Sequence, residues 1–256
     1  MIHETAIVSE KANISEGVSI GPYSIIGPDV SIGSETIIES HVVITGRTTI
    51  GKQNHFYPFS TIGESPQDMK YKGEDTELEI GDRNTIRESC TINKGTVQDT
   101  SVTRLGNDNW IMAYVHIAHD CQIGNNTVFA NNTTLGGHIE VGDYAIFGGF
   151  SGAHQFCKIG SHSFLGIYAG VAKDLPPYVI VTGQPAVPRG INIEGLKRRG
   201  FTTEQIRNIK NAYKLLYNSD LRLEEAQEKI SALDEVSNEL QVMLEFIQAS
   251  TRGIIR

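Results

Sequence analysis

Aromatic residues are scarce in this chain of 256 residues, making up 7% of the sequence with a single tryptophan. So few large rings cannot fill a wide hydrophobic core, whereas the 26 glycines allow chain segments to approach one another closely. The chain therefore has to be built from small, regular pieces. A disulfide framework is equally disfavoured, because the three cysteines are odd in number and far apart, at positions 90, 121 and 157. Free thiols fit a reducing compartment, so we expect a cytoplasmic protein.

Positive charge and long apolar runs are also lacking. Lysine and arginine together number 22 against 30 acidic residues, which gives a formal net charge of −8. This balance disfavours general binding of nucleic acid. No apolar run approaches the roughly 18 residues that span a bilayer, and the opening "MIHETAIVSE" lacks the features of a signal peptide. We therefore expect neither a nucleic-acid partner nor an integral membrane protein.

An apolar residue recurs at every sixth position over most of the first 171 residues. Its register pauses twice and then resumes, and its members are Ile2, Val8, Ile14, Ile20, Ile26, Ile32, Ile38, Ile44, Ile50, Phe56, Ile62, Ile80, Ile86, Ile92, Leu105, Ile111, Ile117, Ile123, Phe129, Leu135, Val141, Phe147, Ala153, Ile159, Leu165 and Val171. Neither the 3.6-residue period of a helix nor the two-residue alternation of a strand produces a strict period of six.

Two further biases accompany this apolar slot. Glycine often follows it directly, and four residues after it the side chain is typically small or β-branched. One large and one small inward residue in each hexad, with a turn between hexads, is typical of a hexapeptide β-helix. Three short strands then form a triangular coil of about eighteen residues, and coils stack about 4.8 Å apart. All three cysteines occupy the small slot, so we interpret them as core filler and not as ligands or nucleophiles.

The two pauses in the register predict side loops near residues 63–79 and 93–104, because a solenoid accommodates insertions as loops on its surface. The first loop carries the polar residues Gln67, Asp68 and Lys70. One interpretation is an ordinary solvated loop, and the other is an arm that reaches a ligand or a neighbouring subunit.

Helices are expected after the repeat ends. Prolines follow Val171, and from Gly195 onward the apolar spacing becomes helical. Thr202 and Gln205 have the spacing of a capping box at the start of the segment 201–219, and the segments 221–233 and 235–250 continue the helical pattern. We therefore expect a β-helix over residues 1–190 and a small helical domain over residues 191–256.

The eighteen-residue coil predicts which polar side chains meet. Gly137 lies eighteen residues after His119, and Gln155 lies eighteen after Gly137; His138 has the same relation to Asp120. One outer edge should therefore collect the residues His116, His119, Asp120, His138, His154 and Gln155.

Three interpretations of this column compete. The histidines could be solvated edge residues. His116, His119 and His138 could bind zinc, as histidines do in the trimeric hexapeptide-repeat carbonic anhydrases. Alternatively, His119 could act as a general base whose tautomer is held by Asp120, while the bare backbone N–H of Gly137 stabilises an oxyanion.

The motifs "HIAHDC", "QDMKYKGE", "NIEGLKRRGF", "NAYKLLY" and "STRGIIR" closely resemble the acyl-carrier-protein–UDP-N-acetylglucosamine O-acyltransferases, which begin lipid A synthesis. This resemblance covers the whole chain. It implies a left-handed parallel β-helix, a homotrimer with active sites between subunits, and transfer of a (3-hydroxy)acyl group from acyl carrier protein to the 3-hydroxyl of UDP-N-acetylglucosamine. An acceptor with a 3-amino group is the main alternative. No metal or cofactor is implied.

The resemblance also implies roles for individual residues. His119 would be the general base, assisted by Asp120, and Gly137 would supply the oxyanion N–H. The remaining residues expected to bind substrate are Gln67, Asp68, Lys70, His116, His138, His154, Gln155, Asn192, Glu194, Arg198 and Arg199. Ile167, with Phe164, is expected to close the acyl groove early and to favour a shorter chain. Because the carrier protein is acidic, a local basic face is needed, and Arg207, Lys210 and Lys214 share one face of a predicted helix. The alternative interpretation of these three residues is an ordinary solvated helix face.

Overall fold

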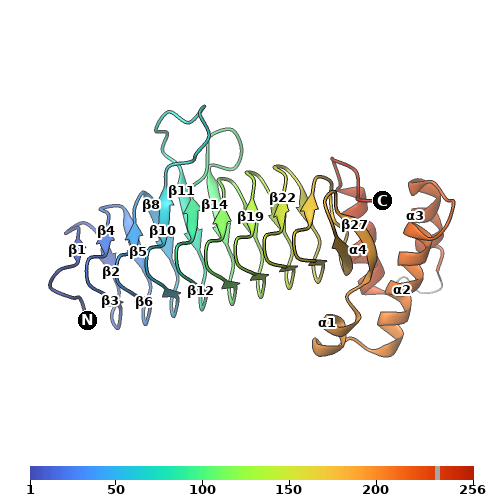
Figure 1. Cartoon of the computed structure of the whole chain (residues 1–256), viewed down its shortest axis with the longest axis horizontal. Helices are drawn as coiled ribbons and strands as arrows, with labels where there is room; N and C mark the ends of the chain where they lie inside the picture. Colours follow the sequence, from blue (N-terminus) through green and yellow to red (C-terminus); the bar gives the residue numbers. More distant parts are fainter. Residues whose placement is uncertain (234–236) are drawn as a thin grey trace.

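The computed structural model describes residues 1–233 and 237–256, and its short strands wind around a three-sided prism that runs along most of the molecule (Figure 1). Within these residues the strands form three sheets of ten, nine and eight strands. Neighbouring strands in each sheet are parallel, except for the antiparallel pair β26 and β27 at the end of the ten-stranded sheet.

Each coil contributes one strand to each side of the prism. Sheet 1 contains β3 (Ser19–Ile20), β6 (Ile37–Ile38), β9 (His55–Phe56), β12 (Thr85–Ile86), β15 (Trp110–Ile111), β18 (Val128–Phe129), β21 (Ile146–Phe147), β24 (Phe164–Leu165), β26 (Val179–Thr182) and β27 (Val187–Ile191). Sheet 2 contains β1 (Ile7–Val8), β4 (Ile25–Ile26), β7 (Val43–Ile44), β10 (Thr61–Glu64), β13 (Thr91–Asn93), β16 (His116–Ile117), β19 (Thr134–Leu135), β22 (Gly152–Ala153) and β25 (Gly170–Val171). Sheet 3 contains β2 (Asn13–Ile14), β5 (Val30–Ile32), β8 (Arg47–Ile50), β11 (Glu77–Ile80), β14 (Val102–Leu105), β17 (Gln122–Ile123), β20 (Glu140–Val141) and β23 (Lys158–Ile159).

The chain passes from sheet 1 to sheet 2 to sheet 3 in every coil, and we name the turns between them edge 1–2, edge 2–3 and edge 3–1. The expected vertical register is confirmed where coils are uninterrupted: His116 pairs with Thr134, and Thr134 pairs with Gly152. Two loops interrupt successive coils, at residues 65–76 and 94–101, and both leave the prism at edge 2–3. They form the projection above the prism in Figure 1.

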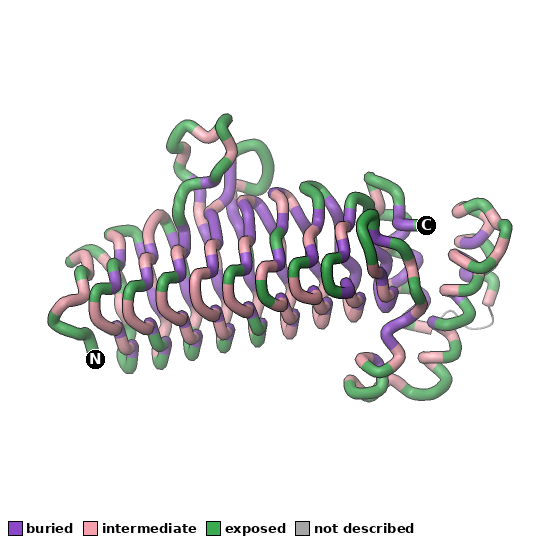
Figure 2. Tube along the Cα trace, in the orientation of Figure 1, coloured by how far each residue is buried: buried purple, intermediate pink, exposed green. Residues whose placement is uncertain are grey.

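The apolar slot fills a narrow core that begins at Val18, and buried positions recur in the successive coils of Figure 2 except at the N-terminal end of the prism. Its largest side chains include Phe129 and Phe147, whose rings stack 4.5 Å apart. Cys90, Cys121 and Cys157 are buried, and burial raises their pKa values to about 12, 12 and 11. These thiols stay neutral, which confirms their interpretation as core filler.

Two details of the core differ from the sequence pattern. Ile2, the first member of the apolar slot, is 51% exposed because it lies in the terminal coil. Asn54, Asn84 and Asn109 occupy the slot expected to hold small or β-branched residues. Each is buried and donates from its side-chain amide to a glycine carbonyl of the next coil, so the cost of burying a polar group is offset.

The C-terminal part of the chain consists of helices packed at the end of the prism (Figure 1). Their bounds are α1 (Ile193–Arg198), α2 (Thr203–Tyr217), α3 (Leu223–Ser231) and α4 (Asn238–Gln248). The capping box is confirmed, because Thr202 accepts from the backbone of Gln205 at 3.2 Å while the Gln205 side chain accepts from the backbone of Thr202 at 2.9 Å. The first residues of the predicted helical segment 235–250 lie outside the described residues.

The last residues of the chain return to the prism. The buried carboxylate of Asp174 accepts from the hydroxyl of Ser250 at 2.6 Å and from the backbone of Lys158 at 2.8 Å, and its carbonyl accepts from Ile255. This contact ties the helical part to the final coils. Among the described helices, none combines the length and apolar character needed to cross a membrane.

Candidate active site

Edge 2–3 brings together most of the polar residues that the eighteen-residue register predicts. His119 and Asp120 lie in the turn after β16, Gly137 and His138 in the turn after β19, and the next turn contributes His154 and Gln155. Asp120 and His138 both adopt left-handed backbone conformations, with φ values of 59° and 62°. They occupy the same turn position in successive coils, which places one side chain beside the other.

Asp120 is the buried centre of this group. Its carboxylate accepts from Nδ1 of His119 at 2.9 Å, and from the backbone and hydroxyl of Thr96 at 3.0 and 2.6 Å. Burial pushes the pKa of Asp120 upward, but the hydrogen bonds from His119 and Thr96 and the nearby charge of His138 outweigh it, so the pKa is lowered. The carboxylate is therefore ionised at neutral pH and holds the proton of His119 on Nδ1.

His119 lies directly against the backbone of Gly137. A Cβ atom added to Gly137 would lie 2.5 Å from Cε1 and 2.8 Å from Nε2 of the His119 ring, so the close approach requires glycine. Within the described part of the chain, the N–H of Gly137 makes no hydrogen bond. With 12% of its side chain exposed, His119 offers its free Nε2 beside this available backbone donor.

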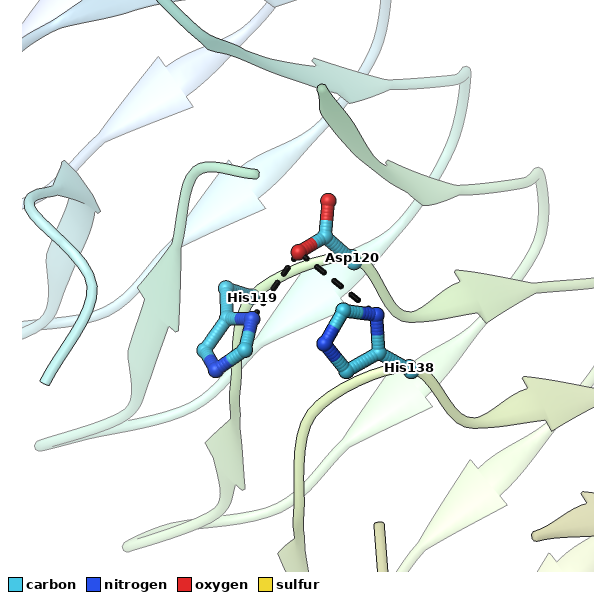
Figure 3. A group of neighbouring side chains, drawn as sticks. All are labelled: His119, Asp120 and His138. Carbon is cyan, nitrogen blue, oxygen red and sulfur yellow. Dashed lines mark hydrogen bonds and ion pairs between the residues drawn. The ribbon is translucent and has the colours of Figure 1, made fainter. Parts of the chain in front are cut away.

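His138 completes the cluster in Figure 3, where each imidazole turns one nitrogen toward Asp120. The rings of His119 and His138 meet edge to face with centroids 4.9 Å apart, and Phe156 stacks on the other side of His138 at 4.3 Å. Nδ1 of His138 lies 3.7 Å from Asp120 and 2.8 Å from Asp99. Asp99 and Thr96 belong to the loop 94–101, and neither was predicted from the sequence.

His116 faces outward from strand β16, which directly precedes the turn that contains His119. Its Nδ1 is hydrogen bonded to the hydroxyl of Thr91 at 2.7 Å. Desolvation lowers the pKa of His116, and the charge of His119 lowers it further, so the ring is neutral at physiological pH. The three histidines of the zinc interpretation are not gathered around one point. Among the residues that the structure describes, the group whose ligand atoms lie within 4.8 Å of one another is His119, Asp120 and His138.

The loop 65–76 approaches the same edge. The carboxylate of Asp68 accepts from the backbone of Lys70 at 3.0 Å and from the side chain of Gln98 in the second loop at 3.4 Å. The hydrogen bond from Lys70 is the main cause of its lowered pKa, and the charge of His119 contributes. Gln67 and Lys70 are exposed on this loop. The two loops therefore contact each other beside the histidine pair.

A groove of about 580 Å³ runs from His154 across the outer face of sheet 2. Its floor includes Gly152 and Gly170, which stand at outward positions of β22 and β25, and Phe150 bounds it at edge 1–2. Small residues at outward positions leave room for an elongated apolar chain. This floor was not predicted from the sequence either. The signal for it is the pair of glycines that stand one coil apart on β22 and β25.

The structure does not bring the remaining predicted residues to this edge within one chain. Asn192 is buried as the N-cap of α1, where its side chain accepts from Gly195 and donates to the carbonyl of His162 at edge 3–1. Arg199 lies at the same edge, 5.0 Å above the ring of Tyr144, and burial lowers its pKa. Glu194 and Arg198 are exposed on α1.

The two residues expected to close the acyl groove also lie away from His119. Phe164 points outward from β24 in sheet 1, and Ile167 is 64% exposed at edge 1–2. Neither lines the groove on sheet 2 of its own chain. One chain therefore divides the predicted site among its edges and outer faces.

Comparison with known families defines the class of protein. Residues 11–46 and 103–137 match the bacterial transferase hexapeptide repeats, and residues 174–255 match the model described as "Udp N-acetylglucosamine O-acyltransferase; Domain 2". These matches place the chain among the hexapeptide-repeat transferases.

Individual relatives narrow this class. An acyl-[acyl-carrier-protein]–UDP-N-acetylglucosamine O-acyltransferase of Herminiimonas arsenicoxydans is 54% identical over 260 residues, covering 100% of this chain and 99% of its own. The enzyme of that name from Thiobacillus denitrificans is 57% identical over 80% of this chain and 79% of its own. The solved UDP-N-acetylglucosamine acyltransferase of Francisella novicida superposes with a TM-score of 0.97 at 45% identity, covering 100% of this chain and 94% of that one.

The chain belongs to the acyl-[acyl-carrier-protein]–UDP-N-acetylglucosamine O-acyltransferase family of enzymes. The expected left-handed parallel β-helix followed by a small helical part is confirmed by the structural match and the parallel sheets. Neither a 3-amino acceptor nor a carbonic anhydrase is supported by these relatives.

Proposed function

We propose that this enzyme transfers a (3-hydroxy)acyl group from acyl carrier protein to the 3-hydroxyl of UDP-N-acetylglucosamine. The observation that carries the proposal is the position of His119, held by Asp120 at Nδ1 and pressed against the backbone of Gly137. The names of the relatives supply the two substrates. The fixed tautomer leaves Nε2 of His119 as the proton acceptor.

The reaction follows from this geometry. Nε2 of His119 takes the proton of the sugar hydroxyl as its oxygen attacks the thioester carbonyl. The new C–O bond produces an oxyanion, which the free N–H of Gly137 stabilises. When the C–S bond breaks, the proton on His119 passes to the departing sulfur and leaves a thiol. The ionised Asp120 stabilises the imidazolium between these two steps.

We further propose a homotrimer. Outward side chains on sheet 3 carry paired charges, such as Arg104 with Glu79 at 2.6 Å and Lys158 with Glu140 at 3.1 Å, which suit contact with water. Sheets 1 and 2 instead expose apolar side chains. Together with edge 1–2 they present Ile7, Tyr23, Ile25, Ile37, Phe59, Trp110, Tyr114, Phe150, Ile167 and Tyr168, all more than a third exposed.

An apolar surface of this extent is typical of a subunit interface. If edge 1–2 lies toward a threefold axis, sheet 2 of one subunit faces sheet 1 of the next. Edge 2–3 of the first subunit then meets edge 3–1 of its neighbour. This arrangement joins His119 to the neighbour's α1 residues, and it places the sheet 2 groove opposite the neighbour's Phe164.

In this assembly the residues have separate roles. Gln67, Asp68, Lys70, His116 and Gln155 bind the sugar and pantetheine region, and the neighbouring Arg198 and Arg199 bind the diphosphate through their guanidinium groups. Asn192 and Glu194 position the nucleoside. The acyl chain occupies the groove beside His154, where the neighbour's Ile167 limits its length.

The helical part, which we divide from the β-helix near residue 190, would receive the acyl carrier protein. Arg207, Lys210 and Lys214 are exposed on α2, and Arg207 pairs with Glu204 at 3.2 Å. Such a basic face attracts an acidic partner even though the whole chain is negative. Free, buried cysteines suit a reducing compartment, so we assign the reaction to the cytoplasm.

The function is tested by assaying the purified protein with acyl carrier proteins of several chain lengths and UDP-N-acetylglucosamine. Wild-type protein should release the free carrier thiol and form the 3-O-acylated sugar. His119→Ala should reduce kcat by at least about 10²-fold, which is the usual contribution of a general base. The variant should keep its oligomeric state in gel filtration. Turnover within about tenfold of wild type would contradict the role of His119.

A further inference from the structure

The loop 94–101 contacts the histidine cluster at two points. Thr96 donates twice to the buried carboxylate of Asp120, and Asp99 lies 2.8 Å from Nδ1 of His138. Asp99 and His138 are 39 residues apart in sequence, a separation that the coil register does not connect. The loop therefore supplies a second carboxylate to the two imidazoles, in addition to Asp120.

The ring of His138 is closely confined. Its side chain is 8% exposed, Phe156 stacks on it at 4.3 Å, and the ring of His119 meets it at 4.9 Å. Its Nδ1 has two carboxylates within 4 Å, because Asp120 lies 3.7 Å away and Asp99 lies 2.8 Å away. The Nδ1 proton of His138 therefore points to Asp99, which is the nearer acceptor.

Removal of Asp99 changes what this proton can reach. The nearest remaining carboxylate is Asp120, whose Oδ2 already accepts from His119 at 2.9 Å. A hydrogen bond to a charged acceptor is strong, so His138 would compete with His119 for the same oxygen. A small movement of Asp120 toward His138 would weaken the contact that fixes the tautomer of His119.

We propose that Asp99 is a positioning residue for acyl transfer, because it engages His138 and so reserves Asp120 for His119. Asp99 does not contact the reacting atoms and acts through His138. The proposal rests on the function proposed above and adds a residue to it. It also gives the loop 94–101 a role in catalysis. Thr96 of this loop orients the carboxylate of Asp120, and Asp99 keeps His138 from competing with His119 for that carboxylate.

The decisive experiment compares steady-state kinetics of Asp99→Ala, His138→Ala and the double variant in the acyl-transfer assay. Loss of an orienting partner typically costs about 10- to 100-fold in activity, so Asp99→Ala should lower kcat by at least about tenfold. The KM for the sugar nucleotide should stay within about threefold, because the lost interaction acts on the base. In the His138→Ala background the same change should alter kcat by less than about twofold.

Asp99→Asn provides the rescue variant, because its amide oxygen still accepts the Nδ1 proton of His138. Asp99→Asn should keep kcat within about threefold of wild type. If the negative charge of Asp99 served only to stabilise the loop, Asp99→Asn would lose as much activity as Asp99→Ala. Asp75→Ala is the matched control. It removes a carboxylate from the neighbouring loop, where Asp75 pairs with Arg47, and should leave kcat unchanged.

Each remaining outcome counts against the proposal. Asp99→Ala with wild-type kinetics, equal losses in both backgrounds, or equal losses for alanine and asparagine would all overturn it. If His138→Ala itself has no measurable activity, the comparison of Asp99→Asn with Asp99→Ala decides. These failures are distinct from failure of the proposed function, in which the wild-type enzyme itself would not transfer acyl groups.

Discussion

A single residue position decides how tightly the candidate base is held. Position 137 lies between the ring of His119 and the following coil, where Phe156 donates its backbone N–H to the Gly137 carbonyl. The φ of Gly137 lies outside the left-handed region, so its backbone conformation does not require glycine. Glycine is needed because a side chain would collide with the His119 ring. The histidine can therefore approach the backbone donor only while position 137 has no side chain.

Gly137→Ala is therefore expected to disable the enzyme while leaving the fold intact. The new Cβ would overlap three atoms of the His119 ring, at 2.5 to 3.0 Å, and turn the ring away from Asp120. We expect kcat to fall by about 10²-fold or more, comparable to losing the base itself, with little change in melting temperature. Steady-state assays and thermal melts of the purified variant measure both.

Gly149→Ala is the control for this prediction. A Cβ at position 149 would meet its nearest neighbour, the carbonyl oxygen of Asn131, at an ordinary 3.6 Å, so activity should be retained. If Gly137→Ala kept wild-type kcat, the close packing of His119 against position 137 would have no catalytic meaning.

At the scale of elements, the sequence predicts coils much better than loops. Period six identifies the inward slots, and stacking by eighteen places His138 over Asp120 without any coordinates. The same arithmetic fails across the inserted loops, where Thr61 pairs with Thr91 and Thr91 pairs with His116. Thr96 and Asp99 escaped prediction for this reason, since a loop of eight residues has no repeat to set its position.

Edge 3–1 shows a second limit of the sequence. Tyr144 and His162 lie eighteen residues apart and their rings stack 4.9 Å apart. Nothing in that spacing shows that Tyr178, Phe201 and Arg199 contact the same histidine. These partners follow the end of the repeat, where helices pack on the prism. The expected role of Arg199 came from motif resemblance, and its desolvated environment came from the structure.

This edge should make stability depend on pH. Burial, and next the charge of Arg199, lower the pKa of His162 to about 4, below its ordinary value of 6.5; Asp143 opposes the shift. Between these values the unfolded chain binds a proton that the folded chain does not, so stability falls as pH decreases from about 6.5 toward 4. His162→Phe keeps the aromatic stack and removes the titration.

Melting temperatures of wild type and His162→Phe between pH 7.5 and 4.5 test this prediction. The wild-type melting temperature should decrease by several degrees more than that of the variant over this range, and the two curves should be closest to parallel above pH 7. Parallel curves throughout would mean that His162 does not link protonation to folding.

At the scale of the whole molecule, the main feature to be explained is that the residues of the predicted site lie at different edges of one chain. His119 lies at edge 2–3, whereas Arg199 lies at edge 3–1, on the other side of the charged sheet 3. No movement within a rigid prism brings these edges together, since every coil is hydrogen bonded to the next. A second copy, turned about a threefold axis, does so without deforming either chain.

Subunit mixing tests this arrangement directly. His119→Ala and Arg199→Ala trimers should each be nearly inactive. After the two are unfolded together and refolded at equal concentrations, about three quarters of the trimers should be mixed, and each mixed trimer contains one site in which both residues are native. Each intact site takes its base from the Arg199→Ala chain and its arginine from the His119→Ala chain. Because one of three sites is intact in about three quarters of the trimers, activity should recover to about a quarter of the wild-type level. Sites built within single chains would give no recovery, since every chain in the mixture carries one of the two defects.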